Sequence, residues 1–409
     1  MYVYFPCCFR MDDGFFLESP LFPKYPNKEE LPQHRHTFLN LIKSCNTKKD
    51  LSRARHVHSL VLGKGLFCND LWVSNALLSM YAKCGSIKDS VLVFDKLPCL
   101  NHVSWNSMIT GYVQNKLDHE ALKCFKQMQD SGFVPDSISF LYILKACGNI
   151  GAAYKGQKIH AQIVKDGLNV KDMALGDALV DMYGNCGMLS EAQSVFDKLS
   201  VQDLVSWTAL IAGYALLGMD TTVFYMFHRM MEQGKEPDMV TLTLVLNACN
   251  HSGLLDKGQM YFEIMSTCYG VIRTLGHHTC MVDLLGRAGN FKQVEDLLGR
   301  IQTRVDLSIW LRLLGSCRTH SNAELGRWAF DHAMQLHPDR TTLYVWMSNI
   351  YAAAGMQEDA ENIEAMRVKT KTRRKLERKS ENQCKQLHSD LFHLNNIKYA
   401  FHHFKMHYM

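Results

Sequence analysis

The sequence lacks the features that mark a membrane protein, a β-sheet protein or a common enzyme. It has no run of about 18 uncharged apolar residues, so nothing in it supports a transmembrane helix. No stretch alternates apolar and polar residues strongly enough to compete as a β-strand. No Ser/His/Asp set, glycine-rich phosphate loop or pair of carboxylates stands out, so the usual starting points for catalysis are missing.

Positive charge is scarce outside one short segment. The formal net charge is +5, but residues 367–379 hold eight Lys or Arg and a single Glu. Outside that segment, 37 of the 45 basic residues remain against 39 of the 40 acidic residues. Any affinity for nucleic acid must therefore come from a shaped surface and not from bulk charge. The basic segment itself is either a solvated tail or a clamp for RNA.

What the sequence does contain is a long self-similarity at a fixed offset of 102 residues. Residues 104–112 (SWNSMITGY) return as residues 206–214 (SWTALIAGY), and residues 93–97 (VFDKL) return as residues 195–199. The register holds from about residue 35 to residue 290. Such a self-similarity indicates a solenoid, in which each repeat packs only on its neighbours.

The cysteines follow the same register. Cys45, Cys147 and Cys249 are spaced by 102 residues, and so are Cys84 and Cys186. They fall at equivalent positions of expected helices. We interpret them as small buried residues of a protein in a reducing compartment, and not as a disulfide framework.

Each 102-residue block contains shorter repeats of two helices each. In residues 102–136 the first helix carries apolar residues at i, i+3, i+4 and i+7, from Trp105 to Tyr112, which we place in the core. Gly132 and Pro135 end the second helix. Repeat ends at spacings of 31, 35, 36, 31 and 35 residues are Asp70, Asn101, Asp136, Asp172, Asp203 and Asp238. The sequence thus predicts an all-α fold, a right-handed superhelical solenoid of stacked helix-turn-helix repeats.

These repeats resemble pentatricopeptide repeats, specifically those of the plant subfamily in which long, short and standard-length repeats alternate. The resemblance covers about residues 35–374. It rests on near-verbatim family phrases at residues 103–109 (VSWNSMI), 76–85 (ALLSMYAKCG) and 280–289 (CMVDLLGRAG). Residues 307–340 and 341–374 resemble two extension motifs that follow the repeats in organelle RNA-editing factors. Tetratricopeptide repeats keep a constant 34-residue period, which the alternating spacing here does not.

The chain divides accordingly into four expected segments. Residues 1–34 are a leader that we expect to be poorly ordered, and residues 35–306 are the repeat array. Residues 307–374 form two extension-motif helical hairpins, and residues 375–409 form a basic tail that contains histidines. The leader holds several acidic residues, which is not the composition of a typical organelle transit peptide. The resemblance nevertheless implies an organelle, the mitochondrion with the chloroplast as the alternative.

The resemblance implies binding of single-stranded RNA at about one base per repeat, read by two or three side chains. In the family the reading residues are the fifth and last of a repeat. The matching pairs here are Asn75 with Asn101, Asn106 with Asp136, Asp177 with Asp203, Thr208 with Asp238, and Thr279 with Asp306. By the family's pattern the first pair suggests a pyrimidine, the second suggests U, and the fourth and fifth each suggest G. The third pair, Asp177 with Asp203, departs from the family's usual combinations. Leu39 and Leu141, at the fifth place of longer repeats, cannot hydrogen bond to a base edge, whereas Thr243 can.

Helix capping is the competing explanation for the acidic members of these pairs. Asp136 and Asp238 lie where the next helix begins, and Asp is a preferred N-cap residue. Capping would not explain why Asn or Thr recurs at the fifth place, because neither has high helix propensity. We therefore favour base reading for the fifth-place side chains, namely Asn75, Asn106, Thr208 and Thr279.

Many editing factors of this subfamily end in a cytidine deaminase domain, which needs Zn²⁺ ligands and a Glu from an H-x-E motif. The sequence contains neither H-x-E nor C-x-x-C, and the tail histidines lack recognisable ligand spacing. We expect no enzymatic activity, no metal, no cofactor, no small-molecule substrate and no membrane attachment.

Several functions remain open. The first is an RNA-binding adaptor for C-to-U editing that works with accessory factors and a deaminase supplied in trans. The second is an RNA-binding protein in processing, splicing or stability. The third is a peptide-binding helical scaffold. The chain is alternatively a truncated product of an editing-factor gene.

Overall fold

The computed structural model describes residues 31–168, 173–301, 305–338 and 340–372. These residues are helical and contain no β-strand, as the sequence predicts. The chain divides into two compact lobes, a first lobe of residues 1–202 and a second lobe of residues 203–409. The tail expected at residues 375–409 lies outside the described residues, and so does the expected leader, except for its last four residues.

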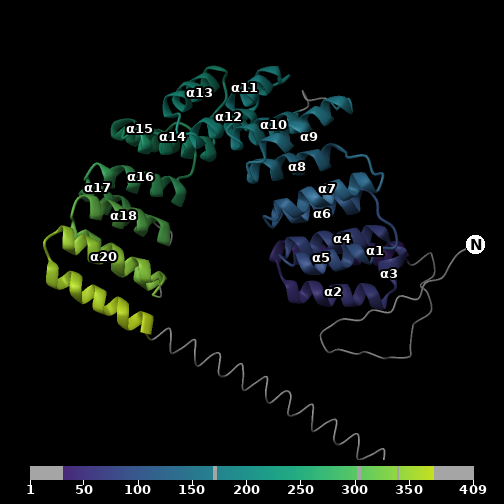
Figure 1. Cartoon of the computed structure of the whole chain (residues 1–409), viewed down its shortest axis with the longest axis horizontal. Coiled ribbons are helices and arrows are strands. Elements are labelled where there is room, and N and C mark those ends of the chain that lie inside the picture. Colours follow the sequence, from purple (N-terminus) through teal and green to yellow (C-terminus); the bar gives the residue numbers. More distant parts are fainter. Residues whose placement is uncertain (1–30, 169–172, 302–304, 339, 373–409) are drawn as a thin grey trace, which may run out of the picture. The chain divides into compact units, whose positions relative to one another are not determined.

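The first lobe is built from helical hairpins (Figure 1). The first helices of its repeats are α1 (Leu31–Lys48), α4 (Leu71–Lys83), α6 (His102–Gln114), α8 (Ser137–Asn149) and α10 (Met173–Asn185). The second helices are α2 (Leu51–Gly63) with the short α3 (Leu66–Asn69), α5 (Ile87–Asp95), α7 (Asp118–Asp130), α9 (Ala153–Lys165) and α11 (Leu189–Lys198). Each first helix packs on its own second helix and on the next first helix, as α6 does with α7 and α8.

The second lobe continues with the same hairpin. Its first helices are α12 (Leu204–Leu216), α14 (Met239–His251), α16 (Leu275–Arg287), α18 (Leu307–Thr319) and α20 (Thr341–Ala353). Its second helices are α13 (Asp220–Glu232), α15 (Leu255–Thr267), α17 (Phe291–Gly299), α19 (Ala323–Leu336) and the helical residues 357–372. The expected extension motifs thus form the hairpin of α18 with α19 and the hairpin of α20 with residues 357–372. No described helix combines the length and the hydrophobicity needed to cross a membrane.

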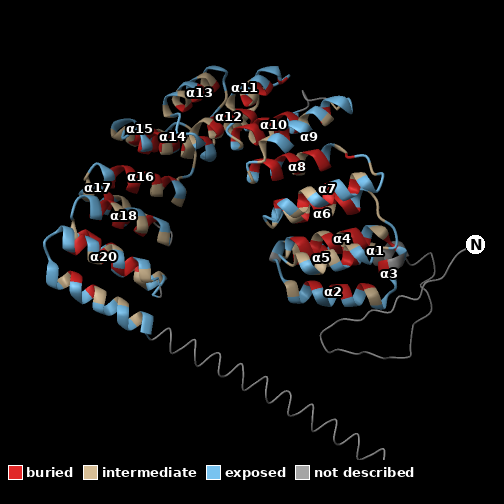
Figure 2. Ribbon diagram, in the orientation of Figure 1, coloured by how far each residue is buried: buried red, intermediate tan, exposed pale blue. Residues whose placement is uncertain are grey.

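The core of each lobe runs along the first helices, where Figure 2 shows long buried stretches on α4, α8 and α10. Trp105 is buried, as predicted, whereas Tyr112 is only half-buried. Close contact between neighbouring repeats also depends on small residues. A Cβ atom at Gly111 of α6 would lie 2.8 Å from Cβ of Ala82 on α4, closer than two carbon atoms can approach.

The 102-residue register is visible in individual contacts of the first lobe. The thiol of Cys84 donates to the carbonyl oxygen of Cys45 at 3.8 Å, and Cys186 donates to that of Cys147 at 3.7 Å. Cys45, Cys147 and Cys249 are fully buried, as predicted, and burial raises the pKa of both Cys147 and Cys249 to about 11. Thiols that stay protonated are poor nucleophiles, so these residues act as packing groups.

A buried histidine fixes the start of α16. His277 Nδ1 accepts from the backbone N–H of Thr274 at 3.0 Å, and Nε2 donates to the carbonyl oxygen of Met239 at 2.9 Å. The ring must therefore be neutral, because a proton on Nδ1 would face the Thr274 N–H. Burial accordingly lowers the pKa of His277 below its usual value.

The depressed pKa of His277 predicts a loss of stability in acid. The unfolded chain takes up the proton as the pH falls below about 6.5, whereas the folded chain resists it, so the free energy of unfolding should decrease from there downward. His277→Gln, which keeps a capping acceptor at this place, should reduce that decrease. Urea unfolding of the full chain between pH 7.5 and pH 5 checks this, with the exposed His119→Gln as control. An unchanged pH dependence in His277→Gln would contradict the assignment.

Candidate nucleic-acid interface

At six described repeat boundaries, the last residue of a repeat caps the first helix of the next repeat. In each case a side-chain oxygen accepts a backbone N–H near the helix start, where four N–H groups have no partner within the helix. The described capping residues are Asp70, Asn101, Asp136, Asp203, Asp238 and Asp306. Asp172, which we also expected at a repeat end, lies outside the described residues. Helix capping therefore explains why Asp or Asn occupies the last place of these repeats, whether or not RNA is read there.

The structure brings Asn106 and Asp136 together. The amide nitrogen of Asn106 lies 3.0 and 2.9 Å from the two carboxylate oxygens of Asp136. Ser139, at the third place of α8, donates its hydroxyl to Oδ1 of Asn106 at 2.6 Å and lies 2.9 Å from Oδ1 of Asp136. The buried Ser139 thus holds the fifth residue of one repeat against the cap of the next.

Asn75 and Asn101 have the same arrangement. The Asn75 amide nitrogen lies 3.4 Å from Oδ1 of Asn101, and the hydroxyl of Ser104 donates to Oδ1 of Asn75 at 2.8 Å. The same hydroxyl lies 3.0 Å from Oδ1 of Asn101. Two consecutive repeats of the first lobe therefore use one device, a hydroxyl that bridges the two predicted reading residues.

Thr208 and Asp238 are linked through a third residue. The Thr208 hydroxyl lies 3.0 Å from the hydroxyl of Thr241, and Thr241 donates both its backbone N–H and its hydroxyl to Oδ1 of Asp238, at 2.8 and 2.7 Å. Because these bonds converge on Oδ1, Oδ2 of Asp238 can accept from another molecule. Thr208 and Asp238 are both half-buried.

The bonds that Thr279 and Asp306 make differ from those of the three pairs above. Thr279 donates its hydroxyl to the carbonyl oxygen of Leu275 in its own helix at 2.7 Å, and the exposed Asp306 accepts from the backbone of Ser308 and Ile309. Asp177 lies half-buried on α10, in the first lobe, while Asp203 caps α12, in the second.

An exposed apolar side chain recurs at the second residue of the first helices, which the sequence reasoning missed. Three members in the first lobe and two in the second are Trp72, Val103, Ile138, Val205 and Val240, with exposed fractions from 48% to 72%. Each lies three positions before a fifth residue. The sequence did hold a signal for them. Each is an apolar residue that lies next to a capped helix start but outside the apolar stripe that faces the core. These side chains can pack against the face of a base.

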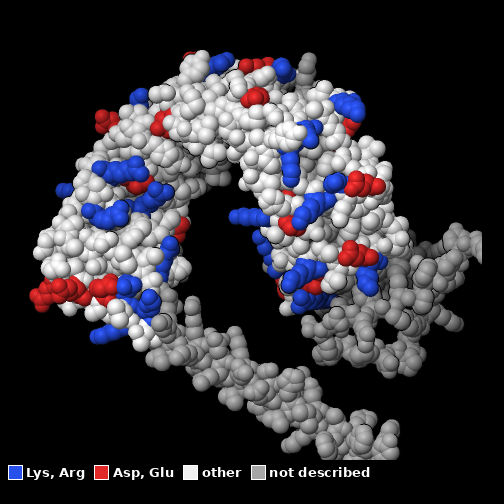
Figure 3. All heavy atoms as spheres, viewed as in Figure 1, with Lys and Arg blue, Asp and Glu red and all other residues white. Residues whose placement is uncertain are grey.

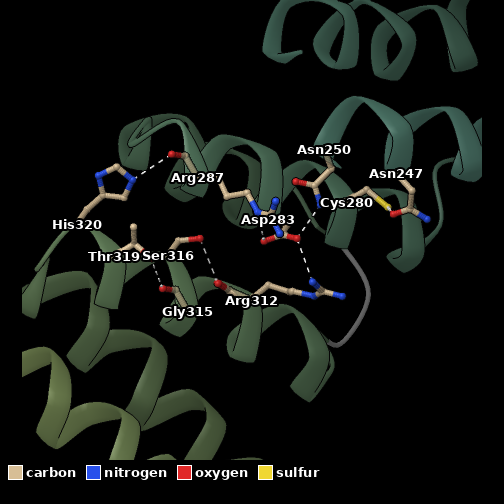
Figure 4. A network of polar contacts seen from close by, with 10 residues as sticks. All are labelled: Asn247, Asn250, Cys280, Asp283, Arg287, Arg312, Gly315, Ser316, Thr319 and His320. Carbon is tan, nitrogen blue, oxygen red and sulfur yellow. Dashed lines mark hydrogen bonds and ion pairs between the residues drawn. The ribbon is translucent and has the colours of Figure 1, made fainter. Parts of the chain in front are cut away.

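A buried carboxylate joins three successive first helices in the second lobe (Figure 4). Asp283 of α16 accepts from the amide of Asn250 on α14 at 2.7 Å and from the guanidinium of Arg312 on α18 at 3.0 Å. Arg287 lies 3.5 Å from the other carboxylate oxygen. The side chains of Arg287 and Arg312 remain about half exposed, at 53% and 56%. Lys and Arg atoms accordingly gather over α16 and α18 in Figure 3, and they also gather over helices of the first lobe.

The described part of the chain shows no candidate metal site. No three His, Cys, Asp or Glu side chains there are grouped so as to hold a metal ion. The chemistry that the repeat boundaries offer is hydrogen bonding from amides, hydroxyls and carboxylates beside exposed apolar groups. That combination suits recognition by hydrogen bonds and apolar contact.

The double role of Asp136 predicts unequal costs for two cap deletions. Asp306→Ala removes an exposed cap and should cost about 1 kcal/mol. Asp136→Ala also deprives Asn106 and the buried Ser139 of a partner, so it should cost about 1–2 kcal/mol more. Urea unfolding of the full-length variants measures both. Equal costs would show that the contact between Asn106 and Asp136 contributes nothing to stability.

Comparison with known proteins agrees with the repeat geometry. Residues 72–102 match a model described as "PPR repeat", residues 100–149 match "PPR repeat family", and residues 179–251 match "Pentatricopeptide repeat domain". The matched segments contain the boundary residues Asn101 and Asp238.

Pentatricopeptide repeat-containing proteins of Arabidopsis thaliana are similar to most of the chain. One is 36% identical over 331 residues, which are 81% of this chain and 40% of that protein. A second, named as chloroplastic, is 36% identical over 81% of this chain and 44% of its own length. A third, named as mitochondrial, is 34% identical over 80% of this chain and 51% of its own length. The chain therefore spans about half the length of these relatives.

The fold is also that of a solved structure. The maize pentatricopeptide repeat protein PPR10, in complex with an 18-nt psaJ RNA element, superimposes with a TM-score of 0.59 over 78% of this chain and 48% of that chain. The two are 15% identical, so this likeness concerns the fold. With its hairpin repeats, its capped boundaries and these relatives in plants, the chain belongs to the pentatricopeptide repeat family.

Proposed function

We propose that the protein binds single-stranded RNA and recognises sites of C-to-U editing in an organelle, with the deaminase supplied in trans. The observation that carries the RNA-binding part is the contact between Asn106 and Asp136, held by Ser139 beside the exposed Val103. A donor, an acceptor and an apolar surface thus stand together at one repeat boundary. These are the groups that reading an unstacked base requires.

The chemistry of each pair supports a particular base. The Watson–Crick edge of U presents two carbonyl oxygens and one N–H, which match the amide donor of Asn106 and the carboxylate of Asp136. The edge of G presents two N–H donors next to a carbonyl oxygen. Oδ2 of Asp238 can accept from such donors, and the Thr208 hydroxyl can rotate to donate or accept. We therefore assign U to the repeat of Asn106 and G to the repeat of Thr208.

The exposed apolar residues add affinity without choosing a base. Trp72 and Val103 lie at the second residue of consecutive first helices, so a base facing one repeat can pack against the side chain of that repeat and of its neighbour. Every base has an apolar face, so this contribution does not depend on sequence. The half-exposed Arg287 and Arg312 offer charge for phosphate groups.

Editing, as distinct from other RNA functions, is supported by the resemblance of residues 307–374 to the extension motifs of editing factors. The proposal places the deaminase on a partner because the sequence holds neither H-x-E nor C-x-x-C. Similar proteins that are named as mitochondrial and as chloroplastic support an organelle. We favour the mitochondrion, with the chloroplast as the alternative.

The number of readable pairs predicts weak binding by the chain alone. A good base contact is worth on the order of 1–3 kcal/mol of discrimination, and about four repeats carry a readable pair. We expect weak, salt-sensitive binding to single-stranded RNA that a protein partner sharpens. Filter binding at several salt concentrations measures this. Nanomolar, sequence-selective binding by the isolated chain at physiological salt would contradict it.

Exchange of one side chain should change the preferred base. Thr208→Asn recreates the pair of Asn106 with Asp136, because the new amide oxygen can accept from Thr241 as Asn106 accepts from Ser139. The repeat should then prefer U over G, while stability changes by only a few tenths of a kcal/mol. The measurement is binding to two RNAs that differ only at the base facing this repeat, together with thermal melts.

Asp238→Ala is the control for this exchange. It should lower both RNA affinity and stability, the latter by about 1 kcal/mol, because Asp238 also caps α14. If Thr208→Asn changes the preferred base but leaves the stability of the protein unchanged, base reading is separated from helix capping. If the ratio of G to U binding stays the same in Thr208→Asn, the side-chain assignment is wrong.

A further inference from the structure

A pocket of about 700 Å³ opens in the second lobe between α17, α18 and α19. None of the base-reading residues lines it. It is lined mostly by residues 307–340, the segment that resembles the first extension motif. Its size is that of a site for a small ligand or for a segment of several residues.

Three aromatic side chains form one wall of the pocket. Trp310 is nearly fully buried, and the partly exposed Trp328 meets it edge to face, with ring centroids 5.0 Å apart. The ring of His332 lies 4.5 Å from that of Trp310 at an angle of 33°. His332 Nδ1 donates to the carbonyl oxygen of Trp328 at 3.0 Å, which holds the ring at this wall. The wall therefore offers aromatic surface to a ligand.

The rim of the pocket is acidic. Glu295 of α17 and Glu324 of α19 are both exposed and both line it, and Gln335 adds a neutral polar group. The described lining residues include no Lys or Arg, and leucines supply much of the rest. Two carboxylates next to aromatic rings attract a cation and repel a phosphate backbone. The charge therefore argues against RNA as the occupant.

We propose that this pocket binds an arginine side chain of a protein partner, presented on a short segment with an apolar residue beside the arginine. A guanidinium group is planar and weakly hydrated, so it can lie against Trp328 while its N–H groups reach the carboxylates. The volume exceeds that of one side chain, which leaves room for the apolar neighbour against the leucines. The site does not depend on base reading, so it would stand if the RNA assignments failed.

The test uses peptides and the full-length chain. An array of 12-residue peptides, each with one central arginine and varied flanks, is probed with the protein, and the best binders are remade with citrulline in place of arginine. Citrulline keeps the shape but removes the charge. We expect the citrulline peptides to bind about tenfold more weakly, as measured by fluorescence anisotropy. The double variant Glu295→Gln with Glu324→Gln should lose this difference and keep its melting temperature and its RNA binding.

A matched control carries the same charge change elsewhere in the lobe. Glu358→Gln with Glu361→Gln alters exposed residues outside the pocket and should keep the preference for arginine. Equal binding of arginine and citrulline peptides by the unmodified protein would overturn the proposal. A preference for arginine that survives in the double variant Glu295→Gln with Glu324→Gln would also overturn it. A third contradicting result would be that single-stranded RNA displaces the peptides, and does so more strongly in this double variant.

Discussion

At three described repeat boundaries, a side-chain hydroxyl at the third place of a first helix links the cap of that helix to the fifth residue of the preceding repeat. Ser104, Ser139 and Thr241 each bond the capping residue of their own helix, and each also bonds the fifth residue of the preceding repeat. The cap satisfies an N–H that the helix itself cannot satisfy. One small group of atoms therefore sets where a helix begins, how closely two repeats stack and where two polar side chains are held.

The consequence for recognition follows from the hydrogen bonds that already exist. The amide of Asn106 is bonded to Asp136 before any base arrives, so a matching base exchanges one set of hydrogen bonds for another. Such an exchange contributes only about 0.5–1.5 kcal/mol. A base that does not match leaves buried polar groups without partners, which costs more. Under the proposed function, boundaries of this kind would discriminate between bases better than they bind them, and affinity would come from phosphate contacts, apolar packing and the proposed protein partner.

Much of this architecture is predictable from the sequence because its causes are local. The helical period of Trp105 and its neighbours, the caps at Asp136 and Asp238 and the 102-residue register were all readable, and the structure confirms them. The bridging role of Ser139 was not predicted, because the bond to Asn106 spans 33 residues. The hydroxyl of Thr279 bonds the carbonyl oxygen of Leu275 in its own helix, a choice of rotamer that sequence does not encode. The pocket around Trp328 likewise depends on how three helices pack.

The central claim is that the boundary pairs read bases in register, one base per repeat. The most direct measurement is selection of bound sequences from a random pool of single-stranded RNA by the full-length chain. Counted along the sequence, two repeats separate the one that ends at Asp136 from the one that ends at Asp238. Selected RNAs should therefore share a U and a G separated by two positions with weaker preference. Enrichment of a composition without fixed spacing, or of U and G at another spacing, would contradict the claim.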